Sequence, residues 1–274
     1  MKNYFDIKDK VALVTGASSG LGWQIAQAYA SQGAKLALFA RREERLQENK
    51  KILEDEYGVE VMYAVTDVGD PENIAESVKK VVDHFGRIDI LVTAAGMGNN
   101  KPVVDQSAEE WDRHIRIDLS GVYYTCAEVG KVMIEQNYGK IINIGSIHSR
   151  VIFPGGGISA YSSAKGGVMN LTKNLAVEWD KYNITVNAIG PAVFATELTT
   201  ESIEMEGFMD LIAAYCPMGR LGEVLYETCL INCHMRPLVH WRWTDNAEEK
   251  DRQLFGEEFL FHLQALHQAD RSAH

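Results

Sequence analysis

The sequence has few cysteines, few prolines and no long apolar run, and each shortage excludes a class of protein. Four cysteines in 274 residues cannot form the dense disulfide framework of small secreted domains, so we expect reduced thiols and a cytoplasmic protein. No apolar run approaches the roughly 18 residues that a membrane-spanning helix needs. The first ten residues, MKNYFDIKDK, contain no apolar signal-peptide segment. We therefore expect no membrane partner.

Positive charge is also scarce. The chain has 38 acidic and 27 basic residues and a formal net charge of −11. Phosphate backbones repel such a chain, so we do not expect nucleic acid as a partner. Its length and 46% hydrophobic content suit one large α/β domain, or at most two small ones. With only six prolines and no low-complexity linker before residue 200, we expect a single domain over residues 1–223, followed by a tail.

Short apolar runs alternate with longer helical stretches over the first 190 residues. Stretches such as WQIAQAYASQ and PENIAESVKKVVDHFG have helical spacing. This alternation predicts an α/β fold with a single Rossmann-type, doubly wound parallel sheet and helices on both faces. The apolar runs that we predict as buried strands are Val11–Thr15, Lys35–Ala40, Val59–Ala64, Ile88–Thr93, Lys140–Ile144 and Ile184–Ile189.

A glycine-rich turn, TGASSGLG at residues 15–22, joins the first predicted strand to the first predicted helix. Its glycines allow a tight turn and the close approach of a phosphate, which the helix N-terminus attracts. The spacing is not the commoner G-x-G-x-x-G, and a tight strand–helix loop is the alternative. We favour a dinucleotide-binding turn. Its candidate cofactor-binding residues are Gly16, Ser18, Ser19, Gly20, Leu21 and Gly22.

Two arginines follow the second predicted strand. Dinucleotide folds often carry a carboxylate there for the ribose 2′-hydroxyl, but this chain has Ala40, Arg41 and Arg42. A guanidinium binds a 2′-phosphate, which a carboxylate would repel. The pair therefore favours NADP(H) over NAD(H). The alternative is that the arginines only begin a charged, solvated helix.

An ordered set of motifs resembles the short-chain dehydrogenase/reductase family over about the first 222 residues. The motifs are TGASSGLG, TDV at 66–68, AAG at 94–96, IINIGS at 141–146, AYSSAK at 160–165 and VNAIGP at 186–191. Within the family, the run SGVYYTCAEVGKVMIEQNYGKIINIGSIHS and the ending PMGRLGE are most similar to gluconate 5-dehydrogenase-like reductases. The resemblance implies an oxidoreductase that interconverts a carbonyl and a secondary alcohol, on a keto-sugar acid such as 5-keto-gluconate or on a polyol. The alternatives are a 3-oxoacyl thioester reductase and a nucleotide-binding protein with little catalysis.

The resemblance also gives roles to a tyrosine and a lysine. Tyr161 lies four residues before Lys165, so both share one helix face, as on any amphipathic helix. The resemblance implies that Tyr161 is the general acid/base and that Lys165 binds the nicotinamide ribose and lowers the phenol pKa. It implies that Ser146 orients the substrate carbonyl. Ser149 is the alternative to Ser146, and a simple serine turn is a third interpretation.

Further cofactor contacts follow from the same resemblance. The residues expected to hold the adenosine are Asp67, Val68, Ala95 and Gly96. Asp67 could instead be only a turn former. The residues expected to face the nicotinamide carboxamide are Pro191, Val193 and Thr196.

The chain departs from the family pattern at position 118 and in the tail. Asp118 stands where the family carries an asparagine, and its negative charge is expected to raise the pKa of Lys165 and offset its effect on Tyr161. The tail 224–274 lacks the family's last strand, which suggests a reading-frame change or a genuine alternative end. Its cysteines and histidines fit no strong zinc spacing, so we expect no metal. The family implies a homo-oligomer, formed through the helices after Ser107 and Tyr161.

Overall fold

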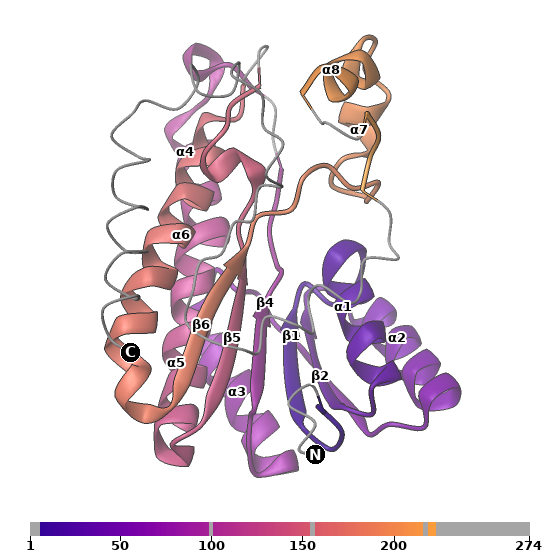
Figure 1. Cartoon of the computed structure of the whole chain (residues 1–274), viewed down its shortest axis with the longest axis vertical. Helices are drawn as coiled ribbons and strands as arrows, with labels where there is room; N and C mark the ends of the chain where they lie inside the picture. Colours follow the sequence, from indigo (N-terminus) through magenta and orange to yellow (C-terminus); the bar gives the residue numbers. More distant parts are fainter. Residues whose placement is uncertain (1–5, 99–100, 154–156, 216–218, 223–274) are drawn as a thin grey trace, which may run out of the picture. The chain divides into compact units, whose positions relative to one another are not determined.

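The computed structural model describes residues 6–98, 101–153, 157–215 and 219–222. They form a six-stranded parallel sheet with the strand order β3-β2-β1-β4-β5-β6 (Figure 1). The predicted Rossmann-type fold is thus confirmed. The strands are β1 Val11–Thr15, β2 Lys35–Ala40, β3 Val61–Val65, β4 Ile90–Thr93, β5 Gly139–Ile144 and β6 Ile184–Ile189.

Strands β1, β2 and β6 have the predicted bounds, and the other three differ by one or two residues at their ends. The later start of β4 has a local cause. The backbone of Ile88 bonds to the side chain of Gln136, whose Oε1 accepts its N–H at 2.9 Å and whose Nε2 donates to its carbonyl at 2.8 Å. The apolar run correctly predicts that Ile88 is buried. The contact with Gln136 takes the place of strand pairing at this residue, so β4 begins later.

Helices cover both faces of the sheet (Figure 1). Alternate strand residues point to opposite faces, so Leu13 and Leu91 belong to the core under α3, α5 and α6, whereas Val14 and Val92 belong to the core under α1 and α2. Burial on both faces explains the continuous apolar runs. The helices are α1 Gly20–Ser31, α2 Glu43–Tyr57, α3 Pro71–Phe85, α4 Ala108–Ile115, α5 Gly121–Gln136, α6 Ser159–Trp179, α7 Thr200–Ile203 and α8 Phe208–Tyr215.

Local sequence sets the ends of the helices. Asp70 caps α3, because its Oδ1 accepts the N–H groups of Glu72 and Asn73 at 3.0 and 3.2 Å, and Pro71 fits the first helical position. A turn of π-helix, Arg116–Ser120, lies between α4 and α5. Such turns are often found at functional sites, and this one contains Asp118.

The order of the strands indicates that a ligand binds at the carboxyl ends of the strands. The strand order reverses between β1 and β4, which pair directly in parallel. Ligands of open parallel sheets bind beyond the carboxyl ends of the strands at such a reversal. The glycine-rich turn after β1 and the loops after β4, β5 and β6 all leave from this edge, so the predicted motifs meet there.

The predicted tail, residues 224–274, lies outside the described residues, as do its cysteines and histidines, and the boundary at 223 remains a prediction. Within the described residues, no helix is long and apolar enough to span a membrane. In the same part of the chain, no group of three or more His, Cys, Asp or Glu side chains could hold a metal ion.

Candidate active site

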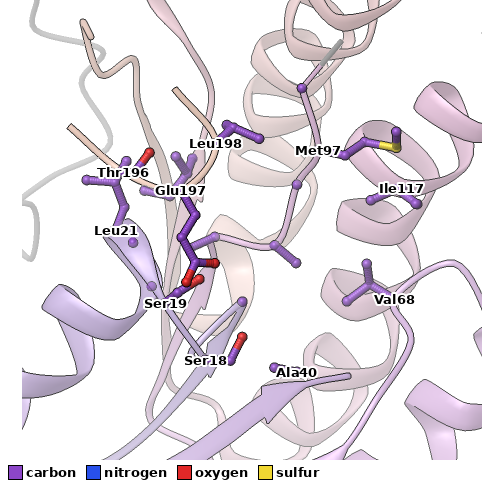
Figure 2. A pocket seen from close by; sticks show the side chains of 18 of the residues that line it. Ser18, Ser19, Leu21, Ala40, Val68, Met97, Ile117, Thr196, Glu197 and Leu198 are labelled. Atoms are coloured by element: carbon purple, nitrogen blue, oxygen red, sulfur yellow. The ribbon is translucent and has the colours of Figure 1, made fainter. Parts of the chain in front are cut away.

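A cavity of about 550 Å³ opens at the carboxyl edge of the sheet. It brings together all of the predicted site residues except Asp118 and Val193. Figure 2 shows part of its wall, with Ser18 and Ser19 from the turn after β1 on one side and Val68 and Ile117 on the other. The predicted residues that line it are Gly16, Ser18, Ser19, Gly20, Leu21, Gly22, Arg41, Arg42, Asp67, Val68, Ala95, Gly96, Ser146, Tyr161, Lys165, Pro191 and Thr196.

The glycine-rich turn packs too tightly for side chains at two of its glycines. A Cβ at Gly22 would lie 2.4 Å from the carbonyl oxygen of Gly16. Gly16 itself has a φ of +70°, and a Cβ there would lie 2.8 Å from the carbonyl oxygen of Ala94. Glycine is required at both positions. The turn therefore brings bare backbone to the cavity wall.

The N-terminus of α1 is prepared for an anion. Ser19 precedes α1 without capping it through its side chain, and the first turn contains no acidic residue. By contrast, Ser107 and Glu110 form a capping box on α4. A helix start with bare backbone and no acidic residue of its own suits the phosphates of a dinucleotide. The residues present thus fit a nicotinamide cofactor at this end of the cavity.

Arg41 and Arg42 both line this end of the cavity. Nη2 of Arg42 donates to the hydroxyls of Ser18 and Ser19 at 3.1 and 2.7 Å, and it lies 3.0 Å from Oε2 of Glu197. The preference for NADP(H) that the sequence analysis drew from these arginines remains a prediction. The sequence analysis missed Glu197, which the segment after β6 brings to Arg42 from far away in the sequence.

Asp67 and Val68 lie on the opposite wall, where the adenosine contacts were predicted. Asp67 is exposed to the cavity, yet its Oδ1 also accepts the N–H of Gly69 at 2.9 Å. Asp67 therefore forms a turn and also lines the cavity, and its contact with the adenosine remains a prediction. Val68 packs against Gly121, where a Cβ would lie 2.9 Å from Cγ2 of Val68.

Tyr161 and Lys165 share one face of α6. Nζ of Lys165 lies 5.8 Å from the centre of the Tyr161 ring and donates to the carbonyl of Ile144 at the end of β5, at 3.0 Å. This hydrogen bond fixes the almost fully buried lysine. The two side chains thus lie on the same face of one helix, as their spacing of four residues predicts.

The pKa directions of this pair differ from the simplest expectation. Burial raises the pKa of Tyr161, the hydrogen bond with Ser146 lowers it, and the charge of Asp118 raises it. Burial lowers the pKa of Lys165, and Asp118 opposes that shift. We expected a lowered phenol pKa and a raised lysine pKa. For Lys165, desolvation outweighs the charge of Asp118. For Tyr161, desolvation outweighs the hydrogen bond with Ser146, and Asp118 adds to the rise in pKa. Asp118 thus acts in the expected direction on both groups.

Ser146 and Ser149 take different positions. Ser146 lines the cavity and is hydrogen-bonded to Tyr161, and its Oγ accepts the N–H of His148 at 3.1 Å. Ser149 instead donates its hydroxyl to the carbonyl of Lys165 at 3.0 Å and is not among the cavity-lining residues. The geometry favours Ser146 as the substrate-facing serine, and its role remains a prediction.

Asp118 lies directly behind the cavity wall and is fully buried. Its Oδ1 accepts the N–H of Met97 at 3.0 Å and lies 3.8 Å from Nζ of Lys165. Its Oδ2 lies 3.2 Å from Nδ1 of His114. The sequence prediction missed His114, although its position four residues before Asp118 on a helix was a sufficient signal.

The segment after β6 closes one side of the cavity. Pro191 and Thr196 line it as predicted, whereas Val193 does not. The carbonyl of Val193 accepts the N–H of Gly222 at 2.8 Å, which turns this residue into a structural link with the end of the described chain. The position of a residue in a family motif does not show whether its side chain in a loop faces the cavity.

Comparison with known proteins agrees with this geometry. The sequence model of a family described as short chain dehydrogenase matches residues 10–207. Gluconate 5-dehydrogenase from Gluconobacter oxydans (strain 621H) is 35% identical over 220 residues, which cover 80% of this chain and 85% of that protein. D-threitol dehydrogenase from Mycolicibacterium smegmatis is 39% identical over 194 residues, covering 71% and 74%.

A solved structure is similar over most of both chains. It is a gluconate 5-dehydrogenase from Burkholderia cenocepacia J2315 in complex with NADP and tartrate, with a TM-score of 0.79 and 31% identity, covering 83% of this chain and 88% of that one. The chain belongs to the short-chain dehydrogenase/reductase family and is similar to its gluconate 5-dehydrogenases. It is therefore an oxidoreductase that acts on CH–OH groups of small molecules and uses a nicotinamide cofactor.

Proposed function

We propose that this chain is an NADP(H)-dependent reductase of a keto-sugar acid, such as 5-keto-gluconate, or of a polyol-derived ketose. The observation that carries the cofactor preference is the pair Arg41 and Arg42 at the end of the cavity beyond β2. Two guanidinium groups suit a 2′-phosphate better than a ribose hydroxyl. The names of the similar gluconate and threitol dehydrogenases support the substrate class.

The proposed chemistry divides between the cofactor and the side chains. A bound nicotinamide would supply or accept the hydride. Tyr161 would give its phenolic proton to the carbonyl oxygen in reduction and take a proton from the alcohol in oxidation. Ser146, hydrogen-bonded to Tyr161, would donate to the same oxygen as negative charge develops there. Lys165 would bind the nicotinamide ribose and stabilise the tyrosinate.

The experiment that tests this function is NADPH oxidation by the full chain with 5-keto-gluconate, a set of ketoses and a 3-oxoacyl thioester. We expect turnover with a keto-sugar acid or ketose, and a higher kcat/KM with NADPH than with NADH. Replacing Arg41 with Gln should lower kcat/KM for NADPH by about ten- to a hundredfold, the value of a hydrogen bond to a charged group.

A matched control for Arg41→Gln is Arg45→Gln, which removes the same charge from the neighbouring helix. Arg45 is exposed and pairs with Glu48, and it does not line the cavity. The NADP(H) proposal is wrong if Arg41→Gln behaves like Arg45→Gln. Turnover of the thioester alone would favour the 3-oxoacyl reductase alternative, and NADPH binding without any turnover would favour a nucleotide-binding protein.

Replacing Asp118 should change the dependence of kcat/KM on pH. Its negative charge raises the pKa of Tyr161, so Asp118→Asn should lower that pKa. Alcohol oxidation requires the tyrosinate, so the acid limb of kcat/KM against pH should move to lower pH. Carbonyl reduction requires the protonated phenol, so its basic limb should also move to lower pH. Unmoved limbs in both directions would contradict an electrostatic role for Asp118.

The proposal includes a cytoplasmic homo-oligomer. Exposed apolar side chains lie on the helices that the family resemblance points to, Tyr123 on α5 and Val177 on α6. Val177 is 82% exposed in the single chain, which suits coverage by a second copy.

A further inference from the structure

Glu197 lies within the cationic end of the cavity. The segment after β6 carries it, and Figure 2 shows its side chain extending from between Thr196 and Leu198 towards Ser19. Its Oε2 lies 3.0 Å from Nη2 of Arg42. Hydrogen bonds with Arg42 and Ser19 lower the pKa of the Glu197 carboxyl, so it is an anion at neutral pH.

Arg42 is held by other groups of the chain. Besides Glu197, its Nη2 donates to the hydroxyls of Ser18 and Ser19, and its Nε lies 3.4 Å from the Ser18 hydroxyl. A guanidinium flanked by two hydroxyls is a suitable site for a phosphate group. In this chain the carboxylate of Glu197 lies at the place that a phosphate would take beside Arg42.

A phosphate would compete with the Glu197 carboxylate for Arg42. A phosphate that approaches Arg42 must displace Glu197 or accept its repulsion, because like charges at close range disfavour each other. A dinucleotide with a free 2′-hydroxyl has no such conflict. The ion pair is about half exposed, with side-chain exposures of 46% for Arg42 and 57% for Glu197, so the competition should be modest and sensitive to salt.

We propose that Glu197 is a specificity-determining residue that competes with the 2′-phosphate of NADP(H) for Arg42 and so weakens the preference for NADP(H) over NAD(H). This inference rests on the proposed function, because it assumes that the 2′-phosphate enters the end of the cavity formed by Arg41 and Arg42. It assigns opposite effects to two neighbouring charges. Arg42 strengthens NADP(H) binding and Glu197 weakens it.

The test is direct titration of the full chain with NADPH and with NADH, followed by the fluorescence of the reduced nicotinamide. Glu197→Gln should tighten NADPH binding about two- to fivefold, the range expected for an exposed ion pair, and leave the NADH Kd unchanged. The gain should shrink as salt is added. It should disappear in the double variant Glu197→Gln/Arg42→Gln, because the competition requires the arginine.

A matched control is Glu204→Gln, which removes the same charge from the exposed residue that follows α7 and is not a cavity residue. Unchanged or weaker NADPH binding by Glu197→Gln would overturn the proposal, since Glu197 would then only orient Arg42. A gain that persists without Arg42, or that Glu204→Gln reproduces, would also overturn it.

The same titrations separate this inference from the proposed cofactor preference. A wild-type chain that binds NADH more tightly contradicts the NADP(H) preference, whereas a gain for NADPH in Glu197→Gln would still support the role of Glu197. If neither the wild type nor any variant binds NADPH, both proposals are wrong.

Discussion

Replacing Tyr161 with Phe is expected to lower kcat for carbonyl reduction by about 10²–10⁴-fold, the usual contribution of a positioned general acid. The change removes only the hydroxyl that would deliver the proton, and the ring keeps its packing on α6. NADPH should still bind, because the glycine-rich turn and the arginines at the far end of the cavity are unaffected. Steady-state turnover and NADPH titration of the same preparation measure both effects.

Tyr57→Phe is the matched control, because Tyr57 ends α2, is partly exposed and does not line the cavity. It should retain wild-type turnover. Should Tyr161→Phe keep more than about a tenth of the wild-type kcat, another group must supply the proton. His148 would then be the first candidate, since its ring centre lies 6.5 Å from that of Tyr161.

The sheet could be predicted because its strands are buried on both faces. A run such as Val11–Thr15 is buried along its whole length, as expected for a strand that has helices on both faces of its sheet. The glycine-rich turn and the Tyr161–Lys165 pair were predictable for a similar reason. Their spacing within one turn or one helix already determines which side chains meet.

Contacts between distant segments could not be predicted in this way. Nothing near Arg42 in the sequence indicates that Glu197 will reach it, because the contact depends on the path of the chain after β6. The same limit applies to Val193, whose backbone orientation depends on Gly222. His114 differs, since its helical spacing from Asp118 was visible and only its burial was not.

The pKa of Tyr161 shows why burial matters more than the identity of the neighbours. The family resemblance indicates that Lys165 and Asp118 lie near Tyr161, but not how far each group is removed from water. Desolvation is the largest influence on both Tyr161 and Lys165, and it opposes the ionised form of each. A bound cofactor with a positively charged nicotinamide would supply part of the stabilisation that the chain alone does not.

Replacing Lys165 with Met is expected to abolish measurable turnover and to lower the free energy of unfolding by about 3 kcal/mol, the cost of removing one partner from a buried ion pair. Nζ of Lys165 lies 3.8 Å from Oδ1 of the fully buried Asp118 and donates to the carbonyl of Ile144. Met has a similar length but supplies neither charge nor donor. Urea unfolding followed by circular dichroism, together with turnover, measures the two losses.

The double variant Lys165→Met/Asp118→Asn separates stability from catalysis. The introduced asparagine would carry no charge that needs a partner, and its amide oxygen could still accept the N–H of Met97, as Oδ1 of Asp118 does now. Most of the lost stability should therefore return, while turnover stays absent because the lysine's own contribution to the tyrosinate and the ribose is still missing. If the double variant is as unstable as Lys165→Met, the loss comes from the Ile144 hydrogen bond and packing. If turnover returns with stability, Lys165 acts only by balancing the charge of Asp118.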